Sequence, residues 1–426
     1  MIVAVITAFL FGLIILNNRT VPNHCRDEEY TERIRIYPDG IKVDGDLISF
    51  VSEASVNNRK SIYFGRLANS SQKEMILKSS EALSLSITAK TDKFKPPTNI
   101  NEFDVEKYYH HQGIKQLINI SKLEIMHDHS SSKVTDVPHI LRTGLLRHTD
   151  NLPVELKRYC QALVIGFRDN DFYQQMSGSS KLGLLHVFSV SGMHVYYFLA
   201  LIDKLLTIIK LPNRLKMMLE VCCLLVYFQF AGGSPGLLRA IVMAIIRLLS
   251  QLLDIEISGI DCWSLTLIMQ LLMLPEAIFL LSVQLSYSLS LGIIITAKRG
   301  LMFQTIILNA ISLPIILYNF YEWHWLSIVA SLVFLPVFTS VIFPLVVIIC
   351  IVGNVKIITS LFEWFVSSFN HLINYVGEMP GMINVGKPPL WFTIFALTLT
   401  YYIAINGLPH LKRNVVLLAS MYIGIF

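Results

Sequence analysis

From residue 181 to residue 426 the sequence is almost continuously apolar, and only short polar or glycine- and proline-containing stretches interrupt it. A helix needs about 20 apolar residues to cross the hydrocarbon core of a bilayer, and runs of roughly this length recur throughout this part of the chain. Charged residues make up only 15% of the sequence, against about 25% in soluble domains. The sequence therefore predicts a polytopic α-helical membrane protein.

The apolar runs predict where the chain crosses the bilayer. We expect spans over residues 183–202, 217–231, 236–253, 260–274, 277–297, 304–321, 325–350, 355–376, 389–406 and 414–426. The run at 355–376 contains the polar residues Glu363, Asn370, His371 and Asn374, so a re-entrant or interfacial helix is the alternative there.

Lysine and arginine concentrate in cytoplasmic loops, which allows the orientation to be predicted. One side of the predicted bundle carries Lys204, Lys210, Arg214, Lys216, Lys298, Arg299, Lys356, Lys412 and Arg413. The other side carries Lys387 alone. This predicts a multi-pass protein of the cytoplasmic membrane with its N-terminus in the cytoplasm and the segment before residue 181 largely outside the cell.

The first part of the chain divides into three segments. Residues 1–20 contain an apolar run without a preceding basic residue or a cleavage pattern, which predicts a retained transmembrane anchor. In residues 21–135, strand-like runs at 33–37, 47–51, 61–65 and 83–88 are separated by turn residues. They predict a small extracytoplasmic β-barrel insert, and a five-stranded OB-like barrel fits residues 31–126, although another small β-domain would satisfy the same pattern.

Residues 136–180 predict linker helices, with a basic amphipathic helix pair over 140–160 that lies on the membrane surface or packs as a soluble helix pair. Cys25 and Cys160 bracket the insert. If the insert is outside the cell, these two cysteines could form a disulfide.

Polar residues follow one another in the first apolar run after residue 181. They are His186, Ser189, Ser191, Gly192 and His194. A serine nucleophile with a histidine base is one interpretation, but no acidic residue is near to orient the imidazole. Two histidines also fall short of a metal site. We favour a third interpretation, in which these residues line an aqueous path and the Ser191-Gly192 pair permits close helix approach or a break.

A second feature combines a helix break with a buried arginine. Gly232, Gly233, Ser234, Pro235 and Gly236 separate two apolar runs, and Arg239 follows in the first turn of the next predicted helix. Because a helix N-terminus favours anions, a positive side chain there indicates an anion-reading role. Snorkelling of the arginine to the head groups is the alternative. In a further span, Gln284 and Ser286 require polar partners within the bundle.

These motifs resemble, in order along the chain, the signatures of the ComEC family of DNA-uptake competence proteins. The residues that carry the resemblance are His186, Ser191-Gly192, His194-Val195, Gly233-Ser234-Pro235, Arg239-Ala240, Pro275 and Gln284-Leu285-Ser286-Tyr287. The segment at 98–114, with Phe103-Asp104, is similar to the one that closes the soluble domain in that family. The resemblance implies passage of one DNA strand across the cytoplasmic membrane during natural transformation.

The sequence departs from the family pattern where many members carry a metallo-β-lactamase-like domain. No H-x-H-x-D-H zinc motif is present, and His127-Asp128-His129 is the nearest match. We therefore expect neither nuclease activity nor a cofactor. The expected partners are single-stranded DNA, the lipid bilayer, a DNA receptor protein outside the cell, a separate nuclease, a cytoplasmic ATPase and, as a possibility, further copies of this chain.

In the soluble domain, exposed aromatic and basic side chains on a barrel face would stack bases and contact phosphates. The candidates are Arg33, Arg35, Tyr37, Lys60, Tyr63 and Arg66, with Phe50 and Phe64 as further aromatics. Two other functions stay open: a secondary transporter of small anions or peptides, and an intramembrane Ser/His hydrolase.

Overall fold

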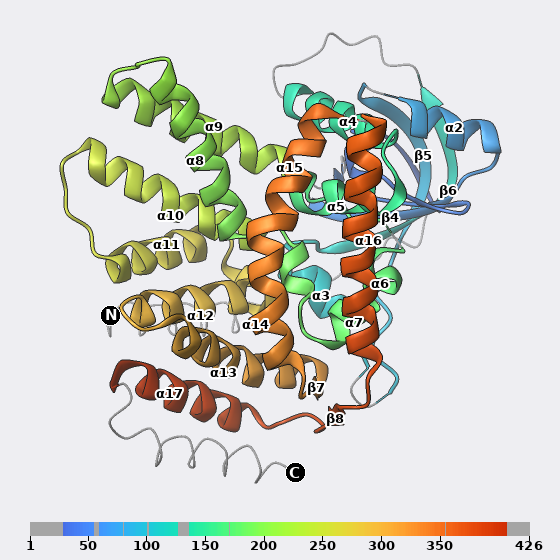
Figure 1. The fold of residues 1–426 in the computed structure, drawn as a ribbon. Helices are drawn as coiled ribbons and strands as arrows, with labels where there is room; N and C mark the ends of the chain where they lie inside the picture. Colours follow the sequence, from blue (N-terminus) through green and yellow to red (C-terminus); the bar gives the residue numbers. More distant parts are fainter. Residues whose placement is uncertain are drawn as a thin grey trace.

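The computed structural model describes residues 29–54, 59–79, 81–99, 102–126, 136–169, 171–353 and 355–406. It consists of an N-terminal β-sheet domain followed by a helical domain (Figure 1). The predicted anchor at 1–20, Cys25, the segment His127-Asp128-His129 and the predicted span at 414–426 lie outside the described residues.

The β-domain is built on one six-stranded sheet with the order β1-β5-β6-β4-β3-β2. Its strands are β1 (Tyr30–Ile36), β2 (Lys42–Asp44), β3 (Leu47–Ala54), β4 (Arg59–Arg66), β5 (Leu83–Asp92) and β6 (Gln116–Met126). Only the β4–β6 pairing is parallel among these neighbours. A short 3-10 helix, η1 (Pro38–Gly40), separates β1 from β2, helix α2 (Ser70–Lys78) connects β4 to β5, and α3 (Val105–His111) connects β5 to β6.

Alternation of side chains explains why these segments form a sheet around a core. In β5, Leu83, Leu85, Ile87 and Ala89 are buried and the residues between them are not, which is the period of a strand with one apolar face. They pack in one cluster with buried residues of β1, β3 and β4. The predicted strand-like runs therefore coincide with β1, β3, β4 and β5.

A group of short helices joins the β-domain to the helical domain. They are α4 (Val137–Thr149), α5 (Val154–Cys160), the π-helical segment η3 (Gln161–Ile165), α6 (Phe172–Gln175) and α7 (Ser177–Lys181). Of these, α5 and α7 pack against α16 (Lys356–Glu378). The Glu363 carboxylate of α16 accepts hydrogen bonds from the backbone N–H groups of Glu155 and Leu156 at the start of α5, at 3.1 and 3.0 Å. Glu363 thus caps α5 across the interface.

Within the described residues, the rest of the helical domain contains four helical stretches that are long and apolar enough to cross a membrane. They are Leu185–Ile208, Pro235–Leu252, Leu301–Phe320 and Ser327–Val352, and shorter apolar helices lie at Gly259–Met273, Leu281–Thr296 and Leu390–Asn406. The elements in order are η4 (Leu185–Phe188), α8 (Gly192–Ile208), α9 (Asn213–Phe230), α10 (Pro235–Leu252), α11 (Gly259–Met273), η5 (Pro275–Phe279), α12 (Leu281–Thr296), α13 (Leu301–Phe320), β7 (Glu322–His324), α14 (Ser327–Val337), η6 (Phe338–Ile342), α15 (Phe343–Val352), α16, β8 (Met382–Asn384) and α17 (Leu390–Asn406).

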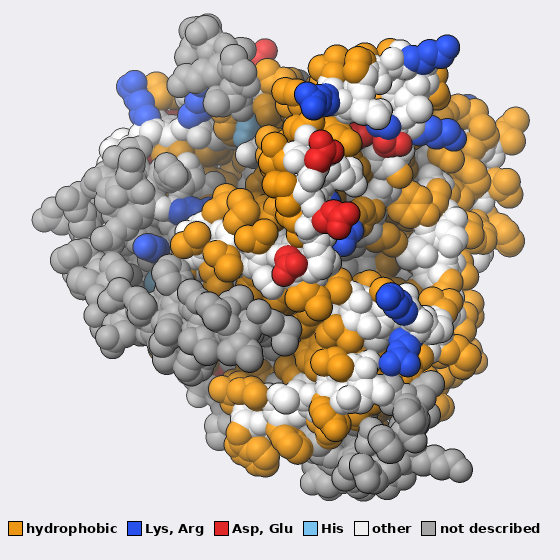
Figure 2. Space-filling view, turned by 90° about the vertical axis from the view of Figure 1, so that its left-hand side faces the viewer, with side chains coloured by type: hydrophobic (Ala, Val, Ile, Leu, Met, Phe, Trp, Pro, Cys, Tyr) orange, Lys and Arg blue, Asp and Glu red, His pale blue; other side chains and the backbone are white. Residues whose placement is uncertain are grey.

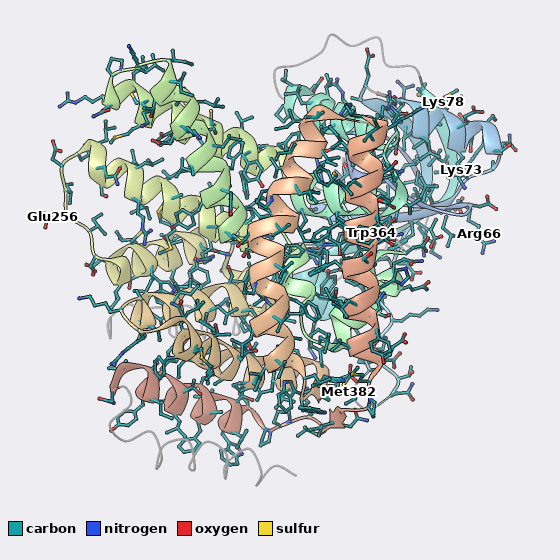
Figure 3. All side chains as sticks on the ribbon, in the orientation of Figure 1. Arg66, Lys73, Lys78, Glu256, Trp364 and Met382 are labelled. Atoms are coloured by element: carbon teal, nitrogen blue, oxygen red, sulfur yellow. The ribbon has the colours of Figure 1, made fainter. Side chains whose placement is uncertain are left out.

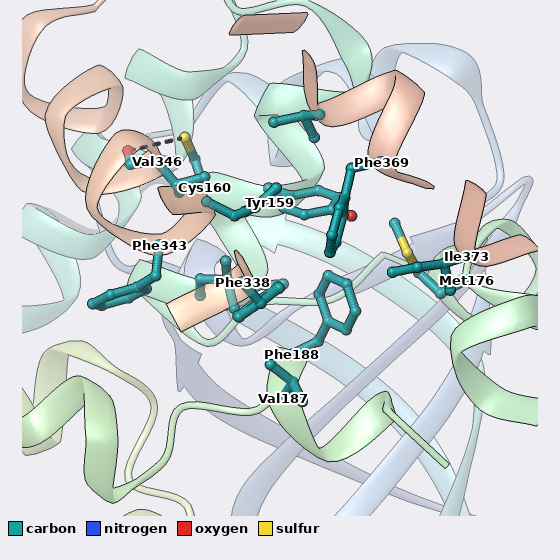
Figure 4. Packing of buried hydrophobic residues seen from close by; sticks show 14 of the residues in the cluster. Tyr159, Cys160, Met176, Val187, Phe188, Phe338, Phe343, Val346, Phe369 and Ile373 are labelled. Carbon is teal, nitrogen blue, oxygen red and sulfur yellow. Dashed lines mark hydrogen bonds between the residues drawn. The ribbon is translucent and has the colours of Figure 1, made fainter. Parts of the chain in front are cut away.

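The helical domain has two parts in Figure 1. Helices α8 to α13 and α17 lie side by side in a stack, whereas the α14–α15 helix and α16 run across the ends of that stack, between it and the β-domain. The largest apolar core lies at this crossing, where Tyr159 of the linker, Phe188 of η4 and Phe338 of η6 meet (Figure 4). Cys160 is a free thiol inside this core. This free thiol differs from the disulfide with Cys25 that the sequence analysis allowed, and Cys25 itself lies outside the described residues.

Candidate anion site at the α8–α10–α12 junction

The predicted helix break between two apolar runs is present. Helix α9 ends at Phe230, and Gly232 and Gly233 have φ angles of 84° and 59°, a left-handed conformation that glycine adopts without strain. Ser234 is the N-cap of α10, and its hydroxyl accepts a hydrogen bond from the Leu237 backbone N–H at 3.4 Å. Pro235 then starts the helix, where its fixed φ is favourable and its missing N–H is harmless.

The second predicted break precedes α8. Residues 183–202 do not form one helix, because the chain is extended at Ser189 and Ser191 and α8 starts only at Gly192. Ser191 and His194 form a capping box, in which the Ser191 backbone N–H donates to His194 Nδ1 at 2.9 Å and the Ser191 hydroxyl lies 3.0 Å from the same nitrogen. This box caps the N-terminus of α8 directly after the break.

Arg239 lies where the two helix starts meet. The side chain is 8% exposed, and its Nε donates to the Ser286 hydroxyl of α12 at 2.7 Å. A Cβ atom placed on Gly192 would be 3.1 Å from Arg239 Nη2, so the guanidinium packs closely against this glycine. The structure thus brings together Gly192, Arg239 and Ser286, which the sequence analysis predicted to line the same path through the bundle.

The charge of Arg239 has no acidic partner in the described part of the chain. Besides Ser286, its hydrogen-bonding contact is Met243 Sδ, 3.9 Å from Nη1, and the ion pairs of the described residues do not include it. A buried charge is normally paired. Here the partial positive charge at the N-terminal end of α10 adds to the full positive charge of the guanidinium. The junction therefore favours an anion.

Gln270, which the sequence analysis did not single out, holds this junction in place together with Tyr287. Gln270 of α11 donates from Nε2 to the Pro235 carbonyl at 3.0 Å, and its Oε1 accepts from the Tyr287 hydroxyl of α12 at 2.8 Å. These bonds fix the first turn of α10 against its two neighbours. The available signal was a glutamine within an apolar run, because such a residue needs a partner inside the bundle.

Other predicted lining residues do not join the junction. His186 is exposed, and its Nδ1 is 2.8 Å from the Gly183 carbonyl, while the Ser189 hydroxyl donates to the His186 carbonyl at 2.7 Å. Gln284 is half-buried on α12. The Ser191–His194 pair has the spacing of a nucleophile and base, but within the described structure His194 Nε2 is buried without a hydrogen-bond partner. A triad needs an orienting group at that nitrogen.

Helix α4 links the junction to the β-domain. Asp39 of η1 is buried and accepts hydrogen bonds from Arg142 Nη1 at 3.0 Å, with His139 Nδ1 also at 3.0 Å. On its other side, Arg142 Nη2 would lie 3.0 Å from a Cβ atom on Gly232. One guanidinium therefore contacts both the β-domain and the helix break.

The structure corrects part of the predicted DNA-binding set. Tyr63 is fully buried and donates its hydroxyl hydrogen to Glu32 at 2.9 Å, because position 63 is on the core face of β4. Arg35 and Tyr37 both bind Asp136 at the start of α4, at 2.8 and 2.6 Å. They hold the linker helix against the β-domain, so these three residues do not form an open binding face.

Arg66 belongs to a groove of about 530 Å³ at the end of the sheet. Phe64 and Arg66 of β4 line it, with Phe64 38% exposed. The remaining lining residues are Lys42, Asp44, Leu47, Ile48, Ser49, Gly65, Asn119, Ile120 and Ser121. Arg66 projects away from the helical domain (Figure 3). Arg33 and Lys60 are exposed elsewhere on the sheet.

The described residues contain no group of three His, Cys, Asp or Glu side chains that could hold a metal ion.

Comparison with known proteins identifies the family. The family described as Competence protein matches residues 163–408, which include α8, α10 and α12. ComE operon protein 3 of Bacillus subtilis (strain 168) is 23% identical over 388 residues, which cover 88% of this chain and 49% of that relative. The chain thus spans about half the length of the relative. No solved structure matches. The chain belongs to the Competence protein family, of which the ComEC proteins are members.

Proposed function

We propose that this chain forms a membrane channel that passes single-stranded DNA across the cytoplasmic membrane during natural transformation. Membership of the Competence protein family supports a role in DNA uptake. The observation that carries the channel proposal is Arg239, a buried positive charge without an acidic partner in the described chain, at a junction of helix starts.

The junction has the chemistry that a moving polyanion requires. A phosphate group needs positive charge or hydrogen-bond donors at membrane depth, because a bare charge there costs several kcal/mol or more. A guanidinium presents several donors to phosphate oxygens. Because no described acidic residue pairs with Arg239, the guanidinium can exchange one phosphate for the next, and weak binding is what conduction needs.

The groove of the β-domain is the proposed entry point. Phe64 would stack a base, while Arg66 and Lys42 would contact phosphates. If β1 and β2 are counted as one strand interrupted at Pro38, both edges of the sheet belong to that strand, which supports an OB-like barrel.

The distribution of side chains supports a multi-pass arrangement. Outside the grey region, Figure 2 shows charged side chains among hydrophobic ones on the face at the ends of α8 to α13, as expected where helix ends reach the cytoplasm. The Glu256 loop lies at this end and the Arg66 groove at the opposite end of the molecule (Figure 3). With the loops at 204–216 and 298–299 in the cytoplasm, the groove faces outward. We propose this orientation, with the β-domain outside the cell. We also propose a DNA receptor, a separate nuclease and a cytoplasmic ATPase as partners.

Import of labelled DNA tests the proposal in competent cells that lack this protein. Cells complemented with Arg239→Gln should bind DNA at the surface but accumulate little internal strand. Arg299→Gln, which removes an arginine from the exposed loop between α12 and α13, is the matched control and should import normally. If Arg239→Gln imports as well as the wild type at equal protein abundance, Arg239 is not on the path; if cells without the protein import DNA normally, the channel proposal is wrong.

A further inference from the structure

The β-domain exposes a cluster of large apolar side chains outside its groove. Phe103 is 64% exposed and Tyr108 43% exposed, and Val105 is exposed beside them. The two rings contact each other, with their centroids 5.3 Å apart. We call Phe103, Val105 and Tyr108 the α3 patch. We propose that the α3 patch inserts into the outer head-group region of the bilayer and holds the β-domain against the membrane; this rests on the proposed membrane insertion of the helical domain.

The local structure presents the α3 patch rigidly. The Glu102 carboxylate accepts hydrogen bonds from the Thr98 and Asn99 backbone N–H groups at 2.6 and 2.9 Å. Asp104 then caps α3 by accepting from the Lys107 backbone N–H at 2.9 Å. On the inner side of α3, the Tyr109 ring stacks on Phe94. The patch is therefore held outward by bonds on both sides rather than left as a loose loop.

The position of α3 places the patch beside the membrane helices. Helix α3 packs against η5, and the His111 ring stacks on Phe279 with centroids 5.2 Å apart. Segment η5 connects two apolar helices, and the residues just before it, Leu272 and Met273 at the end of α11, are largely exposed. Helix α3 thus lies at the end of α12 opposite Lys298, next to a segment that follows exposed apolar residues of α11.

The charges around the patch select lipid over DNA as the occupant. Glu102, Asp104 and Glu106 flank the two aromatic rings in the sequence, so the patch lacks the surplus of positive charge that would attract a phosphate backbone. Lys93, Lys95 and Lys107 offset them, so the net local charge is close to zero. An aromatic cluster without net charge is typical of a membrane interface, where amphipathic rings lie at head-group level. Insertion should therefore depend little on anionic lipid.

Nitroxide labels on the full chain in lipid nanodiscs test this inference. Tyr108→Cys, in a background without the native cysteines, should be more accessible to oxygen than to a water-soluble nickel complex. Phe64→Cys, an exposed aromatic position in the groove of the same domain, is the matched control and should show the reverse. The result should be the same in phosphatidylcholine and in phosphatidylglycerol nanodiscs.

Leu272→Cys separates failure of this inference from failure of the membrane proposal. If Leu272→Cys reports lipid while Tyr108→Cys is as accessible to nickel as Phe64→Cys, the α3 patch does not insert. If both Leu272→Cys and Tyr108→Cys report water, the helical domain is not inserted at this level. Protection of the Tyr108→Cys label from nickel only after single-stranded oligonucleotide is added would identify the patch as a base-stacking surface. Protection only at high protein density would identify a contact between copies of the chain. Either result overturns the lipid assignment.

Discussion

Replacing Arg239 with methionine separates a functional charge from a structural one. The guanidinium is buried, is bonded to Ser286 and Met243 and has no acidic partner in the described chain. Methionine is long, unbranched and adaptable, so it can fill the same space beside Met243. The change therefore removes the charge while keeping most of the packing.

The magnitude follows from two opposing contributions. An arginine within a membrane helix costs about 2.5–3.5 kcal/mol on insertion scales, and Arg239→Met removes that cost. The lost hydrogen bond to Ser286, which has a charged donor, contributes about 1.5–3 kcal/mol. The Ser286 hydroxyl can then bond to a carbonyl of its own helix. We expect the free energy of unfolding to stay constant or to rise by up to roughly 2 kcal/mol.

The assay compares unfolding of purified wild-type and Arg239→Met protein in detergent with DNA import in cells. A channel role predicts unchanged or increased stability together with lost import. Ser286→Ala is the matched control, because it removes the same hydrogen bond but keeps the charge. If Arg239→Met lowers the free energy of unfolding by more than about 2 kcal/mol, the guanidinium serves the fold, and its buried charge no longer indicates an anion path.

Three further predictions concern stability. Gly178→Ala should destabilise the protein by about 1–3 kcal/mol, because its Cβ would lie 2.4 Å from Asn374 Cα; Gly144→Ala, with no atom within 4 Å of its Cβ, should be neutral or stabilising in the same unfolding assay. Glu363→Gln should cost about 0.5–2 kcal/mol through the weakened cap of α5, and an unchanged unfolding midpoint would contradict this. Hydrogen bonds from the Asn99 and Thr98 backbone lower the pKa of Glu102. The turn that Glu102 holds should therefore be intact at neutral pH and loosen as the pH falls below the ordinary carboxyl range. A label at residue 103 should report this loosening, and Glu102→Gln should abolish the pH dependence.

Local chemistry made much of the helical domain predictable. Gly232 to Pro235 combine two residues that tolerate positive φ with a cap and a helix-starting proline, so the break and the start of α10 follow from residue type. Gln284 and Ser286 stood out as polar residues in an apolar run, and Ser286 does bond within the bundle. In the β-domain, alternation located β1, β3, β4 and β5.

Partners that are distant in sequence were not predictable. Tyr63 looked like an exposed aromatic because strand alternation does not say which face is covered, and its bond to Glu32 crosses 31 positions. Arg35 and Tyr37 meet Asp136, about 100 residues away. His186 shares an apolar run with His194, but the break before Gly192 turns the two side chains into different environments.

Thiol accessibility at position 286 tests the anion path most directly. Ser286→Cys, in a background without the native cysteines and reconstituted in proteoliposomes, places a thiol in the position of the hydroxyl that lies 2.7 Å from Arg239 Nε. We predict that an anionic, membrane-impermeant thiol reagent modifies it faster than a cationic one, and that single-stranded oligonucleotide slows this reaction. A thiol that is inert to both reagents in the folded protein, or that reacts equally with and without DNA, would show that the junction is dry packing and not a passage.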